Sequence, residues 1–254
     1  MKLYYQNARG IKSKLHNLFL NSSELVYDII IITETWLNDP VYDSEIFPPF
    51  YEVFRCDRRF SALGRQKGGG ALIAISNNYS TEMVDASSVT TIVSAIDLVI
   101  VKCTVNMFIF FLAAVYVPSN ISTSDFELFL ERLEPLLLGK PVILVGDFNI
   151  PQFNNLPSNS SLSSKLQTFI QFTTLLKFMQ HNHVPNCNGR CLDLVFTNFE
   201  VCADVYHEEL PLLREDLYHP ALGITAEFVL SSKPPQFPSL GAKCYNFKKA
   251  NFVN

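Results

Sequence analysis

The chain has 254 residues, of which 48% are hydrophobic and 17% are charged, with a net charge of −4 and a pI of about 5.7. This apolar content is enough for a large folded core and excludes an intrinsically disordered chain. The acidic balance excludes a basic field over the whole molecule, so any nucleic-acid contact must come from a local patch.

The first half of the chain is predicted to be rich in buried strands. KLYYQNA predicts an opening strand, and the segment from about Lys14 to Tyr27 predicts a helix. The run DIIIITETW is short and continuously apolar, which is typical of a strand covered on both faces. GGGALIAIS and two runs between Ile96 and Val117 add at least three strands. Polar residues interrupt the last segment, so two strands are favoured there over a membrane span.

The second half alternates helices and strands. A helix is predicted from Ser124, with Glu127 completing a capping box, and a second from Ser164 with Gln167 to about Met179. VILVGD, CLDLVFTN and ALGITAEFVL predict strands. Residues 1–230 are therefore expected to form one α/β domain. Residues 231–254, with three prolines and four lysines, are expected to be a linker or tail.

The cysteines and the N-terminus bear on the compartment. Six scattered cysteines show no paired framework, and the first residues lack a secretory signal, so an intracellular setting is expected. His181, His183, Cys187 and Cys191 lie within eleven residues and leave a zinc site open as an alternative. It is disfavoured because the cysteines lack the usual short spacing and no second pair follows.

Polar side chains recur at the ends of apolar strands. PVILVGDFNIP carries Asp147 and Asn149 directly after four apolar residues, although a buried carboxylate is costly unless something pairs with it. Ligand chemistry in α/β domains gathers at such strand ends. His219, just before the last strand, shares this position and can protonate or stabilise an oxygen. The other residues of this kind are Asn7, Glu34, Tyr116 and Asp193.

A local basic segment leads into three consecutive glycines. It lacks the Gly-Lys-Ser/Thr ending of a phosphate-binding P-loop, so nucleotide binding is not inferred. The segment is either a solvated loop or a surface that contacts nucleic-acid phosphates, to which three basic residues near Asn7 would add. The candidate nucleic-acid-binding residues are Arg9, Lys12, Lys14, Arg55, Arg58, Arg59, Arg65 and Lys67.

The ordered motifs QNARG, ITETW, AVYVP, VGDFN, LDLVF and YHPAL resemble the six signatures of the endonuclease/exonuclease/phosphatase superfamily. The resemblance covers residues 2–230. YYQNARGIKSK, RCDRR with GGGALIAIS, and GRCLDLVFTN look most like the apurinic-type endonuclease domain of non-LTR, jockey-like retrotransposons. YNFKKANFVN resembles the connector to a reverse transcriptase in those polyproteins, so that domain is an expected partner.

The resemblance implies a fold, an activity and a set of roles. The fold would be a four-layered α/β sandwich in which two mostly antiparallel or mixed sheets are flanked by helices. The activity would be Mg²⁺-dependent nicking of one strand of double-stranded DNA for retrotransposon integration, with Mn²⁺ as a substitute, in the nucleus. The metal ligands would be Glu34 and Asn7. The catalytic residues would be Asp147, Asn149, Tyr116, His219 and Asp193, the last orienting the His219 ring.

The last motif departs from the family pattern. The family has Ser-Asp-His, whereas this chain has Leu217, Tyr218 and His219. We expect Asp216, three residues before His219, to replace the missing carboxylate as a metal ligand. Two alternatives stay open: an inactive or co-opted remnant of the domain, and a phosphatase of the same fold.

Overall fold

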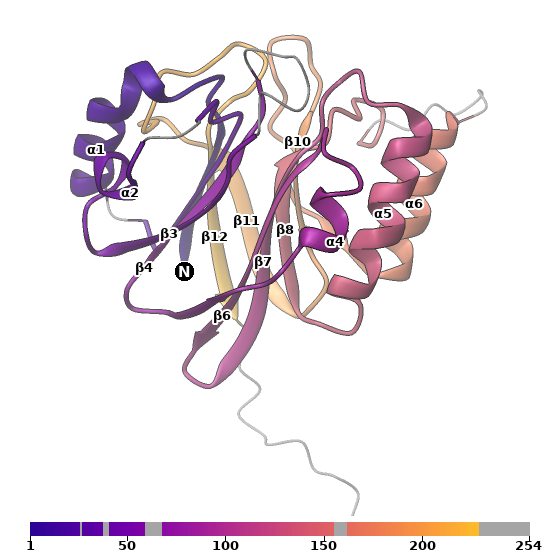
Figure 1. The fold of residues 1–254 in the computed structure, drawn as a ribbon, viewed down its shortest axis with the longest axis horizontal. Coiled ribbons are helices and arrows are strands. Elements are labelled where there is room, and N and C mark those ends of the chain that lie inside the picture. The colour runs from indigo at the N-terminus through magenta and orange to yellow at the C-terminus, as the bar shows by residue number, and fades with distance from the viewer. Residues whose placement is uncertain (26, 38–40, 59–67, 155–161, 229–254) are drawn as a thin grey trace, which may run out of the picture.

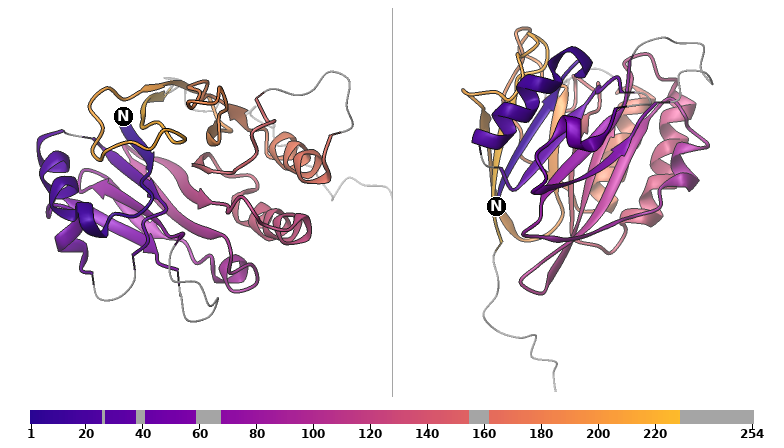
Figure 2. Two further views of the ribbon diagram at one scale, coloured as in Figure 1. Left: turned by 90° about the horizontal axis from the view of Figure 1, so that it is seen from above. Right: turned by 60° about the vertical axis from the view of Figure 1, so that its left-hand side comes forward.

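The computed structural model describes residues 1–228 except 26, 38–40, 59–67 and 155–161 (Figure 1). Two six-stranded β-sheets pack face to face, with helices on the outer face of each. Seen from above, α1 (Leu15–Glu24) and α2 (Asp43–Ile46) cover one side of the sandwich, and α5 (Thr123–Leu137) and α6 (Ser164–Leu175) cover the other (Figure 2). The predicted α/β sandwich of two packed sheets is confirmed.

The first sheet has the strand order β11-β12-β1-β2-β4-β3. Within it, β1 and β2 are parallel and the other neighbours are antiparallel. Its strands are β1 (Lys2–Asn7), β2 (Ile29–Thr33), β3 (Tyr51–Cys56), β4 (Ala71–Ser76), β11 (Val201–His207) and β12 (Leu222–Phe228).

The second sheet has the order β5-β6-β7-β8-β10-β9. Here β7 and β8 form the parallel pair, and the other neighbours are antiparallel. Its strands are β5 (Ser80–Met83), β6 (Asp97–Val105), β7 (Phe108–Tyr116), β8 (Val142–Asp147), β9 (Met179–Gln180) and β10 (Asp193–Thr197).

Three apolar clusters hold the four layers together. The central one joins the facing sides of the two sheets and includes Tyr5, Ile31 and Val145. The others join each sheet to its own helices, as Leu18 and Phe126 do. Strands such as β2 face an apolar cluster on both sides, which explains their continuous runs of isoleucine and valine.

The helices begin and end somewhat differently from the prediction. They are the 3₁₀ turn η1 (Lys12–Lys14), α1 (Leu15–Glu24), α2 (Asp43–Ile46), α4 (Ser87–Thr90), α5 (Thr123–Leu137) and α6 (Ser164–Leu175). The predicted capping serines are wrong by one or two positions. Ser122, not Ser124, accepts the N–H of Asp125 at 3.0 Å, and Ser163, not Ser164, accepts the N–H of Leu166 at 3.3 Å. In each case a run of hydroxyl residues offers several caps.

Two further observations complete the fold. No helix in the described ranges is both long and apolar enough to cross a membrane, and the apolar segment from Leu98 to Val117 forms β6 and β7 as predicted. The predicted linker at 231–254 lies outside the described residues.

Candidate active site

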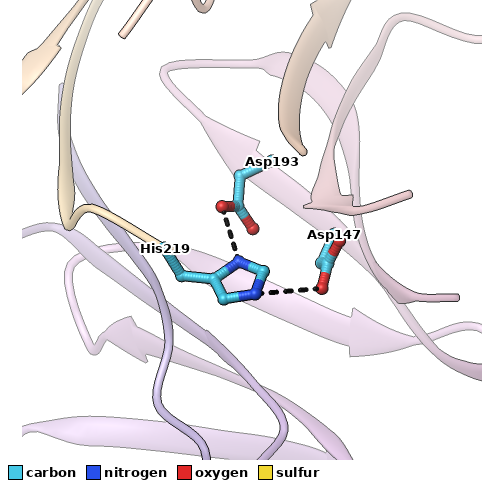
Figure 3. Close-up of side chains that lie close together, drawn as sticks. All are labelled: Asp147, Asp193 and His219. Atoms are coloured by element: carbon cyan, nitrogen blue, oxygen red, sulfur yellow. Dashed lines mark hydrogen bonds and ion pairs between the residues drawn. The ribbon is translucent and has the colours of Figure 1, made fainter. Parts of the chain in front are cut away.

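His219 lies between two carboxylates, Asp193 and Asp147 (Figure 3). Its Nδ1 is 2.9 Å from Oδ2 of Asp193, and its Nε2 is 3.9 Å from Oδ2 of Asp147. All three side chains are buried. Because Asp193 fixes one ring nitrogen, Nε2 faces Asp147 across a gap that a water can bridge by donating to the carboxylate.

Strand pairing places the two carboxylates side by side. Asp147 ends β8 and Asp193 begins the antiparallel β10, and the two residues are paired partners in the register. On the other side of β8, Gly146 allows β7 to lie close to β8. A Cβ at Gly146 would lie 2.0 Å from the backbone oxygen of Val115 in β7, a contact that no side chain can make.

The first sheet contributes Asn7 and Glu34 from the ends of its parallel strands. Asn7 ends β1, and its Nδ2 donates to Oδ2 of Asp147 at 3.0 Å and to Oε1 of Glu34 at 3.4 Å. Glu34 directly follows β2, and its other oxygen accepts the indole N–H of Trp36 at 3.0 Å. The site therefore spans both sheets, with Asn7 as the link between them.

Tyr116 and Asn149 lie at the edge of this network. Tyr116 ends β7 beside Asp147, and its phenol lies close to the Glu34 carboxylate. Burial and the charge of Glu34 raise the pKa of this phenol, so it stays a proton donor at neutral pH. Asn149 donates its Nδ2 to the carbonyl of Val117 at 2.8 Å, and its backbone N–H is bonded to Oδ1 of Asp147 at 3.1 Å.

Left-handed backbone recurs at these positions. The φ angles of Glu34, Trp36 and Asn149 are 50°, 53° and 50°. Non-glycine residues in this region cost of order 1–3 kcal/mol each and persist where the surroundings enforce them, often at functional sites. The strain re-aims the side chains after β2 and β8 toward the common centre.

The electrostatics of the cluster are dominated by crowded negative charge. Burial, and then the neighbouring Asp193 and Glu34 charges, raise the pKa of Asp147 well above its usual range, partly opposed by His219. Burial alone would lower the pKa of His219, but the charge and hydrogen bond of Asp193, with Asp147, raise it to about 9. These influences favour the protonated form of His219, and Asp147 binds a proton more readily than an exposed aspartate does.

The donor set suits a hard divalent cation. Asp147, Asp193 and His219 offer ligand atoms within 4.8 Å of one another, the one such group of His, Cys, Asp and Glu found in the described ranges. Glu34 adds carboxylate oxygens to this set, and the Nδ2 of Asn7 links Glu34 to Asp147, while the Oδ1 of Asn7 accepts the backbone N–H of Arg9. Oxygen ligands of this kind are those that Mg²⁺ prefers, and an added positive charge would relieve the crowding that raises the pKa of Asp147.

Asp216 does not join this cluster, which corrects the expectation that it would replace the missing carboxylate. Its Oδ2 forms an ion pair with Nη1 of Arg9 at 3.1 Å, and its Oδ1 accepts the backbone N–H of Tyr218 at 2.8 Å. The isolated bridge between Asp216 and His219 closes this short loop, and the Asp216 carboxylate lies beside Arg9.

The predicted basic residues are divided by the fold. Arg9 and Lys12 are exposed, whereas Lys14 is half-buried with its ammonium bonded to the Ala8 carbonyl at 2.7 Å. Arg55 is paired with Asp43 and Asp57. The residues of this set outside the described residues are Arg59, Arg65 and Lys67.

Arg58 is a correction to the predicted basic surface. Its side chain is 5% exposed, and it forms an ion pair with Asp97, which is 3% exposed. The guanidinium also donates to the Ala95 carbonyl at 2.8 Å and lies 5.4 Å from the ring centre of Tyr116. This arginine is a buried support behind the site and not a contact for a surface ligand.

Sequence reasoning missed two residues that hold the site together. Tyr5 donates its hydroxyl to Oδ1 of Asp193 at 2.7 Å, across the interface between the sheets. Trp36 fixes the Glu34 carboxylate. Both lie within the quoted motifs KLYYQNA and ITETW, but an inward-facing tyrosine and a half-buried tryptophan also fit an ordinary core.

The residues of the alternative zinc site do not converge. His181 Nε2 is 2.7 Å from the Thr197 hydroxyl, the thiol of Cys191 is bonded to the Val184 carbonyl, and Cys187 is exposed. The thiol contacts are those of a structural cysteine.

Comparison with known families decides the membership. The family model described as the endonuclease/exonuclease/phosphatase family matches residues 6–211. The chain belongs to this family. No curated protein sequence matches this chain.

Solved structures show the same fold at low sequence identity. The endonuclease domain of TRAS1, a telomere-specific non-LTR retrotransposon, is 14% identical with a TM-score of 0.63, covering 88% of this chain and 96% of that domain. An AP endonuclease from Archaeoglobus fulgidus is 15% identical with a TM-score of 0.59, covering 90% and 100%. TDP2 from D. rerio, complexed with a single-strand DNA product, is 12% identical with a TM-score of 0.54, covering 90% and 99%.

Proposed function

We propose that this family member is a Mg²⁺-dependent endonuclease that nicks one strand of double-stranded DNA by attack of water on a phosphodiester. The observation that carries the proposal is the imidazole of His219 facing the buried carboxylate of Asp147 across 3.9 Å, with Asn7 and Glu34 beside them. A phosphodiester needs a general base for water and charge neutralisation on the phosphate oxygens, and this cluster of side chains offers both.

Each side chain has a proposed part in the reaction. Asp147 takes the proton of the attacking water, for which its raised pKa suits it. As the water oxygen bonds to phosphorus and the P–O bond to the leaving group breaks, His219 stabilises the negative charge on the phosphate oxygens and gives its Nε2 proton to the leaving oxygen, while Asp193 holds its ring. Tyr116 and Asn149 donate hydrogen bonds to phosphate oxygens, and the bond from Asn149 to the Val117 carbonyl leaves its second amide hydrogen for this role.

The metal would be held by Glu34 and Asn7 at the carboxyl ends of β1 and β2. Bound there, Mg²⁺, or Mn²⁺ in its place, supplies positive charge to the phosphate oxygens. Glu34 is only half-buried, so its carboxylate is accessible from the mouth of the site. The Trp36 indole and the Asn7 amide orient it for a ligand on the open side.

The proposed setting is the integration of a non-LTR retrotransposon into chromosomal DNA in the nucleus, with a reverse transcriptase domain as partner. The motifs resemble those elements, and the fold is similar to the endonuclease domain of TRAS1. The exposed cations Arg9 and Lys12 beside the site are suited to DNA phosphates.

The experiment is a plasmid-nicking assay. Wild-type protein with Mg²⁺ should convert supercoiled plasmid to open circle, and EDTA should stop it. Asp147→Asn should lower the rate at least about 100-fold, because losing a general base costs roughly that factor. Asp204→Ala, which changes an exposed aspartate on β11, is the matched control and should nick as the wild type does.

Two outcomes would contradict the proposal. Nicking at one rate by wild type and Asp147→Asn would indicate a contaminating nuclease or a non-catalytic remnant. Release of inorganic phosphate from a phosphomonoester, without any nicking, would favour a phosphatase of the same fold. Melting curves of the variants check that loss of activity does not come from unfolding.

A further inference from the structure

The short loop before His219 presents two large apolar side chains to water. Leu217 is 76% exposed and Tyr218 is 42% exposed, while His219, the next residue, is 3% exposed. Exposed apolar side chains occur on any surface, but a pair directly beside a buried catalytic cluster is informative about ligands. Nothing in the proposed reaction uses either side chain.

The backbone of this loop is held rigidly. The Leu217 carbonyl accepts the N–H of Cys187 at 3.1 Å, and the Tyr218 carbonyl accepts Nδ2 of Asn186 at 3.2 Å. The N–H of Tyr218 donates to Oδ1 of Asp216 at 2.8 Å. The loop therefore fixes where the two side chains are presented, without burying them. Preorganisation of this kind lowers the cost of binding.

A cation completes the arrangement. The Arg9 guanidinium lies 5.4 Å from the centre of the Tyr218 ring and is held there by its ion pair with Asp216 at 3.1 Å. The Arg9 side chain is 43% exposed, and its backbone is left-handed, with φ of 44°. An aromatic ring backed by a cation is a platform on which a nucleobase stacks, and an exposed guanidinium beside it can reach a phosphate.

We infer that Leu217 and Tyr218 form a base-contacting subsite, in which Tyr218 stacks on an unpaired or splayed nucleobase next to the phosphate held at His219. This inference rests on the proposed nuclease function and adds a substrate class to it: DNA that is unpaired, mismatched or easily kinked beside the cleaved bond. Apolar side chains that enter a base step work best where unstacking is cheap.

Binding in EDTA tests the subsite without cleavage. The probes are two DNA duplexes of one sequence, with 2-aminopurine either fully paired or in a central mismatch. Wild-type protein should bind the mismatched duplex more tightly and change the 2-aminopurine fluorescence by stacking. Tyr218→Ala should lose this preference, roughly 5- to 150-fold, the range expected for one stacked base. Tyr218→Phe should keep it.

Phe50→Ala is the matched control. Phe50 is 41% exposed, and its ring centre lies 4.9 Å from that of Tyr51. Tyr51 pairs with Ser76 at the C-terminal end of β4, whereas the site lies at the opposite end of that strand, near Ala71. It should bind both duplexes as the wild type does. Equal effects of Phe50→Ala and Tyr218→Ala would overturn the inference.

The outcome is separable from that of the proposed function. Plasmid nicking by wild type in Mg²⁺ reports on the nuclease alone. If wild type nicks but Tyr218→Ala keeps the full mismatch preference and fluorescence change, the subsite is refuted and the nuclease stands. If Tyr218→Phe behaves like Tyr218→Ala, the ring does not act by stacking and the inference also fails.

Discussion

The buried ion pair of Arg58 and Asp97 gives the sharpest prediction about stability. Removing the guanidinium with Arg58→Met leaves the Asp97 carboxylate buried, with the N–H of Gly70 at 2.9 Å as its remaining donor among the contacts described. Breaking one side of a buried pair costs about 3–5 kcal/mol, because the other charge is stranded. For a chain of this size that corresponds to a melting temperature roughly 6–20 °C lower.

The double variant separates a stranded charge from lost packing. Arg58→Met with Asp97→Asn removes both charges and keeps an acceptor for Gly70, and replacing both members of a buried pair is often nearly neutral. The double variant should therefore be more stable than either single one. Urea unfolding followed by circular dichroism measures the three free energies. Additive losses, with the double variant the least stable, would refute the reasoning.

Acid should partly rescue the single variant. Burial raises the pKa of Asp97, and Arg58 is the main influence that lowers it. Without Arg58, the pKa of Asp97 is higher in the folded protein than in the unfolded chain. The stability of the variant therefore falls as the pH rises from the Asp97 pKa of the unfolded chain through that of the folded protein. The deficit of Arg58→Met should accordingly shrink toward low pH, and that of the double variant should not.

The same variants should disturb the site through a chain of backbone contacts. Arg58 fills the space beside Gly69, where a Cβ would lie 2.1 Å from the guanidinium carbon. The Gly69 carbonyl accepts the N–H of Trp36 at 2.9 Å, and the Trp36 indole donates to Glu34. Because Trp36 is the only tryptophan, its fluorescence reports directly on this connection. We expect a shifted emission spectrum in folded Arg58→Met.

Three further predictions concern the centre of the site. The pKa of His219 is raised to about 9, so protonation of this residue stabilises the folded protein by about 3 kcal/mol at most. This stabilisation is fully present below about pH 6.5 and is lost toward pH 9. In metal-free protein, His219→Gln should therefore reduce the change in melting temperature over this pH range. Tyr5→Phe removes the donor to Asp193 and should cost about 1.5–3 kcal/mol in urea unfolding, while a loss under 0.5 kcal/mol would count against that bond. Gly146→Ala must displace the backbone at Val115 and should lower the free energy of unfolding by about 1–3 kcal/mol. The fraction of the variant that folds should nick plasmid poorly.

The sequence predicted correctly those strands whose burial requires a continuous run of apolar residues. Strands β2 and β8 are covered on both faces, so their apolar runs were visible without knowledge of the topology. The polar residues that end them were visible for the same reason, since Asp147 and Glu34 interrupt an otherwise apolar segment. By contrast, β11 lies at a sheet edge with a mixed pattern, and it was not predicted.

The misplaced features depend on partners distant in sequence or on near-equivalent local choices. Arg58 lies in a basic run and looked like a surface residue, because its partner Asp97 is 39 residues away. The cap of α5 was misassigned because Ser122 and Ser124 are both good capping residues. Which one is used depends on how the chain leaves β7, and local sequence does not contain that information.

The two parallel pairs explain why a single site can draw on both sheets. Parallel neighbours place their carboxyl ends at the same edge, so β1 with β2 delivers Asn7 and Glu34 together, and β7 with β8 delivers Tyr116 and Asp147. Face-to-face packing then brings the two edges within hydrogen-bond reach, as the 3.0 Å contact from Asn7 to Asp147 shows.

Because the site residues come from both sheets, the geometry of the site depends on the relative position of the two sheets. Tyr5 reaches from β1 to Asp193 in β10, so a small shift between the sheets would lengthen this bond and the Asn7 contact together. Close packing of the central cluster resists such a shift. Substitutions in that cluster, far from any reacting atom, should therefore lower activity before they lower the content of secondary structure.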